Sequence, residues 1–138
     1  MTVYFEDLQV GQSAEYAKTI TEADILMFAA VSGDDNPVHI NAEYAEKTMF
    51  KGRIAHGMLT ASLVSTILGT RLPGEGTIFL SNSCKFKAPV RIGETVTARV
   101  TVTEMDSAKK RVKFATQCLV KDNVVVEGEA LVIAPSRG

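Results

Sequence analysis

The amino-acid sequence predicts an α+β protein in which an antiparallel sheet wraps around one long buried helix. Two patterns lead to this class. Residues 54–70 contain no Asp, Glu, Lys or Arg and are rich in Leu, Ala and Ile, so a helix formed there needs protein around most of its circumference. After Gly76, apolar and polar residues alternate with a period of two, which is typical of strands with one buried face. A curved sheet around a single apolar helix accommodates both patterns.

The N-terminal half carries the signals of a strand followed by two helices. Residues 14–20 are expected to form the strand. Thr21 stands three residues before Asp24 in the capping-box spacing, so a helix is expected to begin there. Gly33 is expected to end that helix in a left-handed conformation. Asn41 is expected to cap a second, short helix.

The C-terminal half is expected to hold the apolar helix and four further strands. Four hydroxyl-bearing residues that precede Thr70 in the apolar segment argue against a membrane span. Gly69 and the Leu72-Pro73-Gly74 stretch are expected to end the helix. Strands are expected at 77–87, 95–103, 112–118 and 124–132, with Gly128 as a bend or bulge and hairpin connections at 106–110 and 122–123.

Composition limits the classes of function. The 138 residues are 46% apolar and carry no internal repeat or linker, so residues 1–138 are expected to form one domain. A net charge of −1 argues against nucleic acid and anionic membranes as partners. The N-terminus lacks an apolar leader, and Cys84 and Cys118 lack metal-ligand spacing. We therefore expect a cytoplasmic protein with reduced thiols and neither a metal nor a cofactor.

The residues that suggest chemistry surround the two histidines. His39 ends the string Gly33-Asp34-Asp35-Asn36-Pro37-Val38-His39, and His56 begins His56-Gly57-Met58 at the start of the apolar helix. Taken alone, the first string is a tight turn and His56 is a capping or packing residue. A carboxylate and an imidazole five residues apart across a turn fixed by Pro37 can nevertheless converge on one water.

Together the two strings closely resemble those of the MaoC-like R-specific enoyl-CoA hydratases, in their single hot-dog bacterial form. The resemblance extends over nearly the whole chain, including Phe86-Lys87-Ala88-Pro89-Val90 and Gly128-Glu129-Ala130. It implies a hot-dog fold and the reversible hydration of trans-2-enoyl-CoA to (R)-3-hydroxyacyl-CoA. Bacterial members supply this product for polyhydroxyalkanoate synthesis.

The resemblance also assigns roles to residues. Asp34 and His39 become the catalytic acid and base, and the chemistry agrees, because hydration must remove one proton from water and return one to C2. Which of the two takes the first proton stays open.

Gly57 becomes the donor to the thioester oxygen, at a helix N-terminus where amides are unpaired. Asn36 either holds the loop or touches substrate, and Ser65 either supports Asp34 or is a core serine. His56 is expected to shape the turn before Gly57.

Further expectations concern the substrate and the assembly. The roles of five basic residues stay open, because each could either be solvated surface charge or contact the phosphates of coenzyme A. A homodimer is expected, because a single curved sheet leaves edges that pair with a second copy. Leu63, Leu68 or nearby positions are expected to line the tunnel for the acyl chain. The basic residues are Lys51, Arg53, Lys85, Lys87 and Arg91.

Two other readings remain open. The first is a different hot-dog enzyme, either a dehydratase of acyl-carrier-protein thioesters or a thioesterase. A thioesterase commonly uses a carboxylate on the long helix, and residues 54–70 contain none. The second is a non-catalytic module for acyl-CoA binding or oligomerisation, which loss of Asp34 or His39 would favour. Both residues are present.

Overall fold

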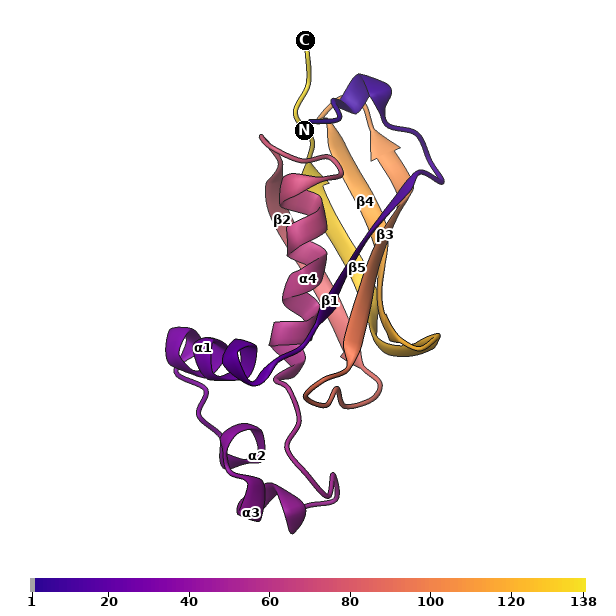
Figure 1. Cartoon of the computed structure of the whole chain (residues 1–138). Coiled ribbons are helices and arrows are strands. Elements are labelled where there is room, and N and C mark those ends of the chain that lie inside the picture. The colour runs from indigo at the N-terminus through magenta and orange to yellow at the C-terminus, as the bar shows by residue number, and fades with distance from the viewer. Residues whose placement is uncertain (1) are drawn as a thin grey trace.

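Residues 2–138, which the computed structural model describes, form an antiparallel sheet of five strands (Figure 1). The order across the sheet is β1-β3-β4-β5-β2, so β1 and β2 are its edges. The bounds are β1 (Ser13–Thr19), β2 (Ile78–Phe86), β3 (Thr95–Asp106), β4 (Arg111–Val120) and β5 (Asn123–Ile133). Each strand overlaps a segment that the sequence predicts as a strand.

The longest helix, α4 (Gly57–Thr70), packs along one face of this sheet, while the other helices extend beyond one end of it (Figure 1). Those are α1 (Glu22–Ser32), α2 (Pro37–Ile40) and α3 (Ala42–Glu46), and a short 3-10 helix spans Phe5–Asp7. This is the predicted α+β arrangement of a sheet around a helix. Among the described residues, no helix is long and apolar enough to cross a membrane.

The core lies between α4 and the sheet. Leu63, Ile67 and Leu68 of α4 are buried against inward-facing strand residues such as Val100 and Phe114, the largest fully buried side chain. Burying such a side chain stabilises the fold by about 1.5–3 kcal/mol relative to leaving it exposed. Alternate β3 residues turn outward, which confirms the period of two.

The local helix signals of the N-terminal half are confirmed. The Thr21 hydroxyl accepts a hydrogen bond from the Asp24 amide, and the Asp24 carboxylate accepts one from the Thr21 amide. Gly33 ends α1 with φ of 80°, and Asn41 caps α3 by accepting from the Tyr44 amide. The helical turn α2 was not predicted.

The apolar helix begins three residues later than the uncharged segment. The amide of Ile54 donates to the Val38 carbonyl, and the amide of Ala55 donates to the Val90 carbonyl. These bonds hold the chain extended between two other segments, so the first helical residue is Gly57. The segment ahead of α4 therefore joins α2 to the connection between β2 and β3.

Gly128 corrects one prediction. The pairing of β5 with β2 and with β4 runs through Gly128 without a register shift, so it marks no bulge. A Cβ atom at this position would lie 1.7 Å from the carbonyl oxygen of Ser83. The glycine is needed because the backbone of β2 approaches it closely.

The two cysteines are free thiols, as expected of a reduced protein. Cys118 lies in the core, where burial raises the pKa of its thiol to about 12. Cys84 is only half-buried.

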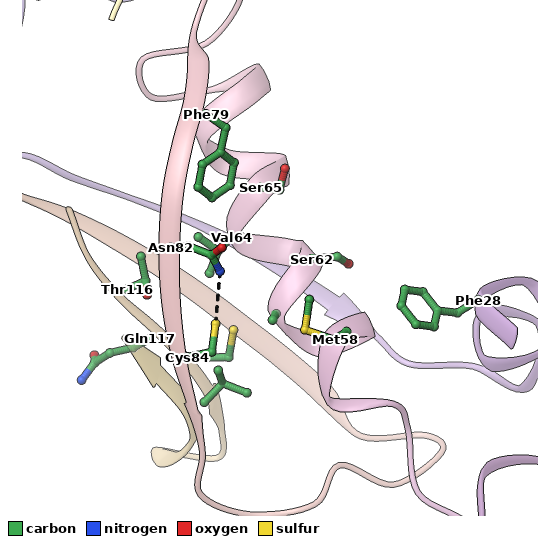
Figure 2. Close-up of a pocket in the computed structure, with 13 residues that line it drawn as sticks. Phe28, Met58, Ser62, Val64, Ser65, Phe79, Asn82, Cys84, Thr116 and Gln117 are labelled. Carbon is green, nitrogen blue, oxygen red and sulfur yellow. Dashed lines mark hydrogen bonds between the residues drawn. The ribbon is translucent and has the colours of Figure 1, made fainter. Parts of the chain in front are cut away.

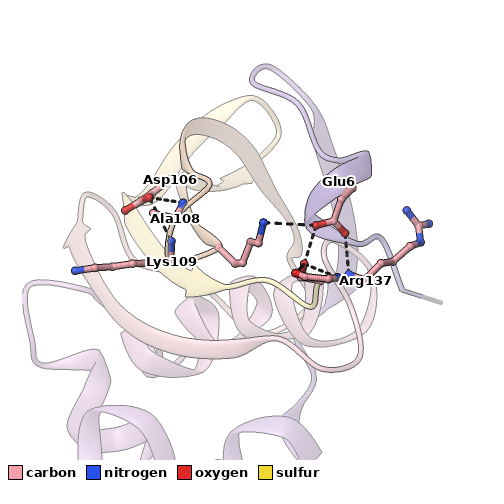
Figure 3. Close-up of polar contacts among 8 residues, drawn as sticks. Glu6, Asp106, Ala108, Lys109 and Arg137 are labelled. Carbon is pink, nitrogen blue, oxygen red and sulfur yellow. Dashed lines mark hydrogen bonds and ion pairs between the residues drawn. The ribbon is translucent and has the colours of Figure 1, made fainter.

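The C-terminal tail binds the N-terminal segment (Figure 3), at the end of the sheet opposite α1, α2 and α3 (Figure 1). The carboxylate of Glu6 accepts hydrogen bonds from the Arg137 amide and the Ser136 hydroxyl. These bonds lower the pKa of Glu6, with the Arg137 amide contributing most. The tail thus binds at one end of the sheet, while α1, α2 and α3 lie beyond the other end.

Candidate active site

Asp34, His39 and His56 meet where the α1–α2 loop approaches the start of α4. One ring nitrogen of each histidine and one carboxylate oxygen of Asp34 all lie within 4.8 Å of one another. Asp34 is exposed, whereas His39 and His56 are 8% and 2% exposed. The structure therefore brings the predicted pair together and adds His56, which the sequence assigned only to a turn.

A chain of short-range hydrogen bonds shapes the loop around Asp34. The Ser32 hydroxyl accepts from the Asp34 amide, and the Asp34 carboxylate accepts from the Asn36 amide. The Asn36 side chain accepts in turn from the Val38 amide, with Pro37 at the first position of α2. Through this contact Asn36 holds the loop, which is one of the two roles left open for it.

The ring of His39 is held in one tautomer. Its Nδ1 lies 2.8 Å from the carbonyl oxygen of Ile54. Because a carbonyl can only accept, Nδ1 carries the proton, and Nε2 of the neutral ring keeps a free lone pair. His39 is thus prepared to accept a proton at Nε2.

His56 contacts both members of the pair. Its Nε2 donates to the main-chain oxygen of Asp34 across 2.8 Å. Its ring stacks on that of His39, with the centroids 3.9 Å apart and the planes inclined by 27°, and Phe28 lies on it at 4.8 Å. Its buried Nδ1 has no hydrogen-bond partner within residues 2–138. His56 therefore fixes the Asp34 backbone against the His39 ring.

The same three side chains are poorly arranged for a metal ion. Zn²⁺ with bonds of about 2.0 Å needs tetrahedral ligand atoms roughly 3.3 Å apart. The rings of His39 and His56 are stacked nearly parallel, so their in-plane lone pairs run side by side instead of converging. The separations suit a water better, since a water with two tetrahedral hydrogen bonds of about 2.8 Å spans about 4.6 Å.

A groove of about 530 Å³ opens beside Asp34 and the first turn of α4. Within residues 2–138, the amides of Gly57 and Met58 have no hydrogen-bond acceptor, as is usual for the first turn of a helix. They present two donors and a partial positive charge near the groove. The other walls are mainly apolar and include Met49, Phe50, Phe86, Pro89 and Val90.

Gly57 is closely covered by Phe86. A Cβ atom on Gly57 would lie 2.7 and 2.8 Å from two carbons of the Phe86 ring. Alanine at this position must therefore displace the ring or the start of α4.

We expect Gly57→Ala to lower kcat for the expected hydration by about 10²-fold, because a displaced first turn moves its amide donors away from the substrate oxygen and losing one such donor usually costs that much. The Gly57→Ala/Phe86→Ala double variant, which removes the clash, should recover most of that loss. Steady-state kinetics on both variants test this prediction. Wild-type kcat in Gly57→Ala alone would show that the first turn of α4 does not serve the reaction.

Ser65 and the expected tunnel residues lie elsewhere. Ser65 is exposed and lines a hollow of about 280 Å³ between α4 and β2, with Phe79 beside it and Met58 at the other end (Figure 2). No hydrogen bond joins it to Asp34 among the described residues. Leu63 and Leu68 are core residues and line neither this hollow nor the groove, whereas the neighbouring Val64 lines the hollow. Met58 lines both spaces.

Three of the five basic residues are already engaged. Arg53 binds Glu22 and the His39 carbonyl, Arg91 donates to the Phe50 carbonyl, and Lys87 pairs with Glu127. Lys51 and Lys85 form no ion pair within the described part of the chain. Of the five basic residues, Lys87 alone lines the groove beside Asp34.

The family follows from a profile match. Residues 7–124 match the family described as "MaoC like domain". The chain belongs to the MaoC-like family. The match covers both the loop with Asp34 and His39 and the start of α4, so the resemblance seen in the two short strings holds for most of the chain.

Relatives along the full length agree. The (R)-specific enoyl-CoA hydratase of Rhodospirillum rubrum is 60% identical over 98% of this chain and 94% of its own. The 3-hydroxybutyryl-CoA dehydratase of Methylorubrum extorquens is 46% identical over 98% and 86%. The unliganded R-hydratase PhaJ1 of Pseudomonas aeruginosa superposes with a TM-score of 0.94 at 45% identity, covering 99% of this chain and 88% of that one. The expected hot-dog fold is confirmed.

Proposed function

We propose that this protein hydrates trans-2-enoyl-CoA to (R)-3-hydroxyacyl-CoA and catalyses the reverse dehydration. The observation that carries the proposal is the pairing of Asp34 with His39. Their carboxylate oxygen and ring nitrogen lie within 4.8 Å of each other, a separation that one shared water can span. Asp34 faces a groove large enough for an acyl thioester, and the names of the two curated relatives describe the two directions of this reaction.

The proposed reaction moves one water onto the double bond. The Asp34–His39 pair takes a proton from the water, and the resulting hydroxide forms a bond to C3 of the enoyl group. Electrons move toward the thioester oxygen, where negative charge develops beside the amide of Gly57. The pair then returns one proton to C2 and restores the carbonyl. Two groups that share a water perform both transfers without another reactant.

The R configuration of the product is proposed from the relatives. The hydratases of Rhodospirillum rubrum and Pseudomonas aeruginosa are named for R specificity. The substrate carrier is proposed to be coenzyme A on the same grounds.

Crotonyl-CoA distinguishes the possible activities. A hydratase consumes the carbon–carbon double bond and releases no thiol, whereas a thioesterase releases thiol and leaves that double bond in the crotonate product. Chiral chromatography should identify the product as (R)-3-hydroxybutyryl-CoA, and crotonyl-acyl-carrier protein offered in parallel should react more slowly. Free thiol, the S product or faster turnover of the carrier protein would each overturn the corresponding part of the proposal.

We also propose that the working unit is a homodimer formed through the edge strand β2. Apart from the half-buried Cys84, β2 is exposed throughout, including Ile78, Phe79 and Leu80. On α1, Met27 is exposed and Val31 is 88% exposed. An uncovered apolar edge of this kind is a surface for pairing with a second copy.

Light scattering should therefore give a mass of twice the 14.9 kDa of one chain. Leu80→Lys places a charge on the β2 edge and should yield a monomer with little activity. Val10→Lys, at an apolar residue that is more exposed than Leu80 (63% against 39%) but lies outside β2, should stay dimeric and active. A monomeric Leu80→Lys protein with full activity would refute the requirement for a dimer.

The cytoplasm is the proposed compartment. Both thiols are free, which suits a reducing environment, and coenzyme A thioesters are the proposed substrates. Residues 1–138 are proposed to act as one domain.

A further inference from the structure

Arg53 has its guanidinium committed to two partners on different segments. Its Nε donates to the main-chain oxygen of His39 across 2.6 Å. Its two terminal nitrogens donate to the two carboxylate oxygens of Glu22, at 2.6 and 3.0 Å. The Arg53 side chain is only 15% exposed, while that of Glu22 is 51% exposed.

The neighbouring bonds concentrate on the same short helix. The amide of Ile54 donates to the Val38 carbonyl, and the Ile54 carbonyl accepts from Nδ1 of His39. Residues 53 and 54 therefore make three hydrogen bonds to residues 38 and 39. Within the four-residue helix α2, only His39 is buried, so these bonds, together with the stacking on His56, fix the position of the imidazole.

Glu22 links the contacts that hold His39 to Asp34, the other proposed catalytic residue. It stands at the first position of α1, and the C-terminal end of the same helix leads directly into the loop of Asp34. The ion pair with Arg53 thus joins the start of α1 to the segment that holds His39. A planar guanidinium makes such paired contacts in fixed directions, which an ammonium group cannot reproduce.

We propose that Arg53 and Glu22 are positioning residues that hold the His39 ring at the reacting water, and that Arg53 does not bind the phosphates of coenzyme A. This inference rests on the proposed hydratase function. A small displacement of a catalytic group can lower a rate by about 10²-fold without weakening substrate binding. The effect of changing either residue should therefore appear in kcat and leave KM nearly unchanged.

The variants Arg53→Lys and Glu22→Gln test the proposal on two substrates. With crotonyl-CoA, each should lower kcat by about 10- to 100-fold and change KM by less than about threefold. Crotonyl-pantetheine, which lacks the phosphates, should show the same loss of kcat. The Arg53→Lys/Glu22→Gln double variant should be no worse than the poorer single variant, because both break one connection.

A matched pair elsewhere provides the control. Arg99 and Glu15 form an ion pair between β3 and β1, with both side chains about half exposed. Arg99→Lys and Glu15→Gln should retain wild-type kcat. If Arg53→Lys instead raises KM for crotonyl-CoA but behaves as wild type on crotonyl-pantetheine, Arg53 is a phosphate-binding residue. Unchanged kinetics on both substrates would equally overturn the proposal.

A measurement independent of activity separates this inference from the proposed function. The chain has only two histidines, so ring nitrogen resonances are readily assigned by NMR with ¹⁵N-labelled histidine. Wild-type protein and the Arg99→Lys control should show His39 in the single Nδ1–H tautomer. Arg53→Lys and Glu22→Gln should show a mixture of tautomers or exchange broadening, and an unaltered His39 spectrum would contradict the positioning role even in a protein with no hydratase activity.

Discussion

Asp34→Asn is expected to lower kcat for hydration of crotonyl-CoA by about 10³-fold, within the range that a positioned acid or base contributes. The amide can still accept the hydrogen bond that the Asp34 carboxylate receives from the Asn36 amide, so the loop should keep its shape. It cannot exchange a proton with the water. His39→Gln should cause a loss of similar size, and combining the two should add little, because both residues act on one water. Stopped-flow absorbance of the enone measures all three variants.

Asp35→Asn is the matched control for this change. Asp35 is the next residue of the same exposed loop, and its carboxylate makes no hydrogen bond or ion pair among the described residues. The variant should keep kcat within a factor of two of wild type. If Asp34→Asn retains more than a tenth of wild-type kcat, the carboxylate is not the acid or base.

Gly128→Ala is expected to lower the free energy of unfolding by about 3 kcal/mol, at the upper end of what overpacking usually costs. The added Cβ would lie 1.7 Å from the oxygen and 2.7 Å from the carbon of the Ser83 carbonyl. Both atoms belong to the backbone of β2, so the strand must move away from β5 and lose pairing there. Urea denaturation followed by circular dichroism gives the value.

Gly69→Ala makes the same chemical change where there is room. No atom lies within 4 Å of the added Cβ, and Gly69 belongs to α4. Alanine should raise the free energy of unfolding by about 0.5–1 kcal/mol, because glycine is the poorer helix former. A Gly128→Ala protein as stable as wild type would show that β2 and β5 are not so closely paired.

The fold could be predicted because its signals are local. The alternation of Val96, Ala98 and Val100 with polar residues reports directly which side of a strand is buried, and all three are fully buried. The capping box of Thr21 and Asp24 concerns atoms three residues apart. Such patterns require no knowledge of what lies across the molecule.

The site was only partly predictable, because its contacts join distant segments. The bond between His56 and the Asp34 carbonyl spans 22 residues, and that between Arg53 and Glu22 spans 31. No periodicity or spacing marks either one. The sequence therefore assigned Arg53 to surface charge or phosphate binding, although its buried guanidinium is used within the protein. The contacts that hold His39 became visible only once the chain was folded.

The stereochemistry of addition in D₂O is the most direct test of the shared water. A carboxylate and an imidazole on opposite faces of a flat enoyl group would each stand about 3.5 Å from it, and so roughly 7 Å apart. The relevant atoms of Asp34 and His39 are within 4.8 Å, which places both on one face. Proton NMR of the 3-hydroxybutyryl-CoA formed from crotonyl-CoA should show the deuteron at C2 and the hydroxyl at C3 added to the same face. Addition to opposite faces would contradict a single water held between Asp34 and His39.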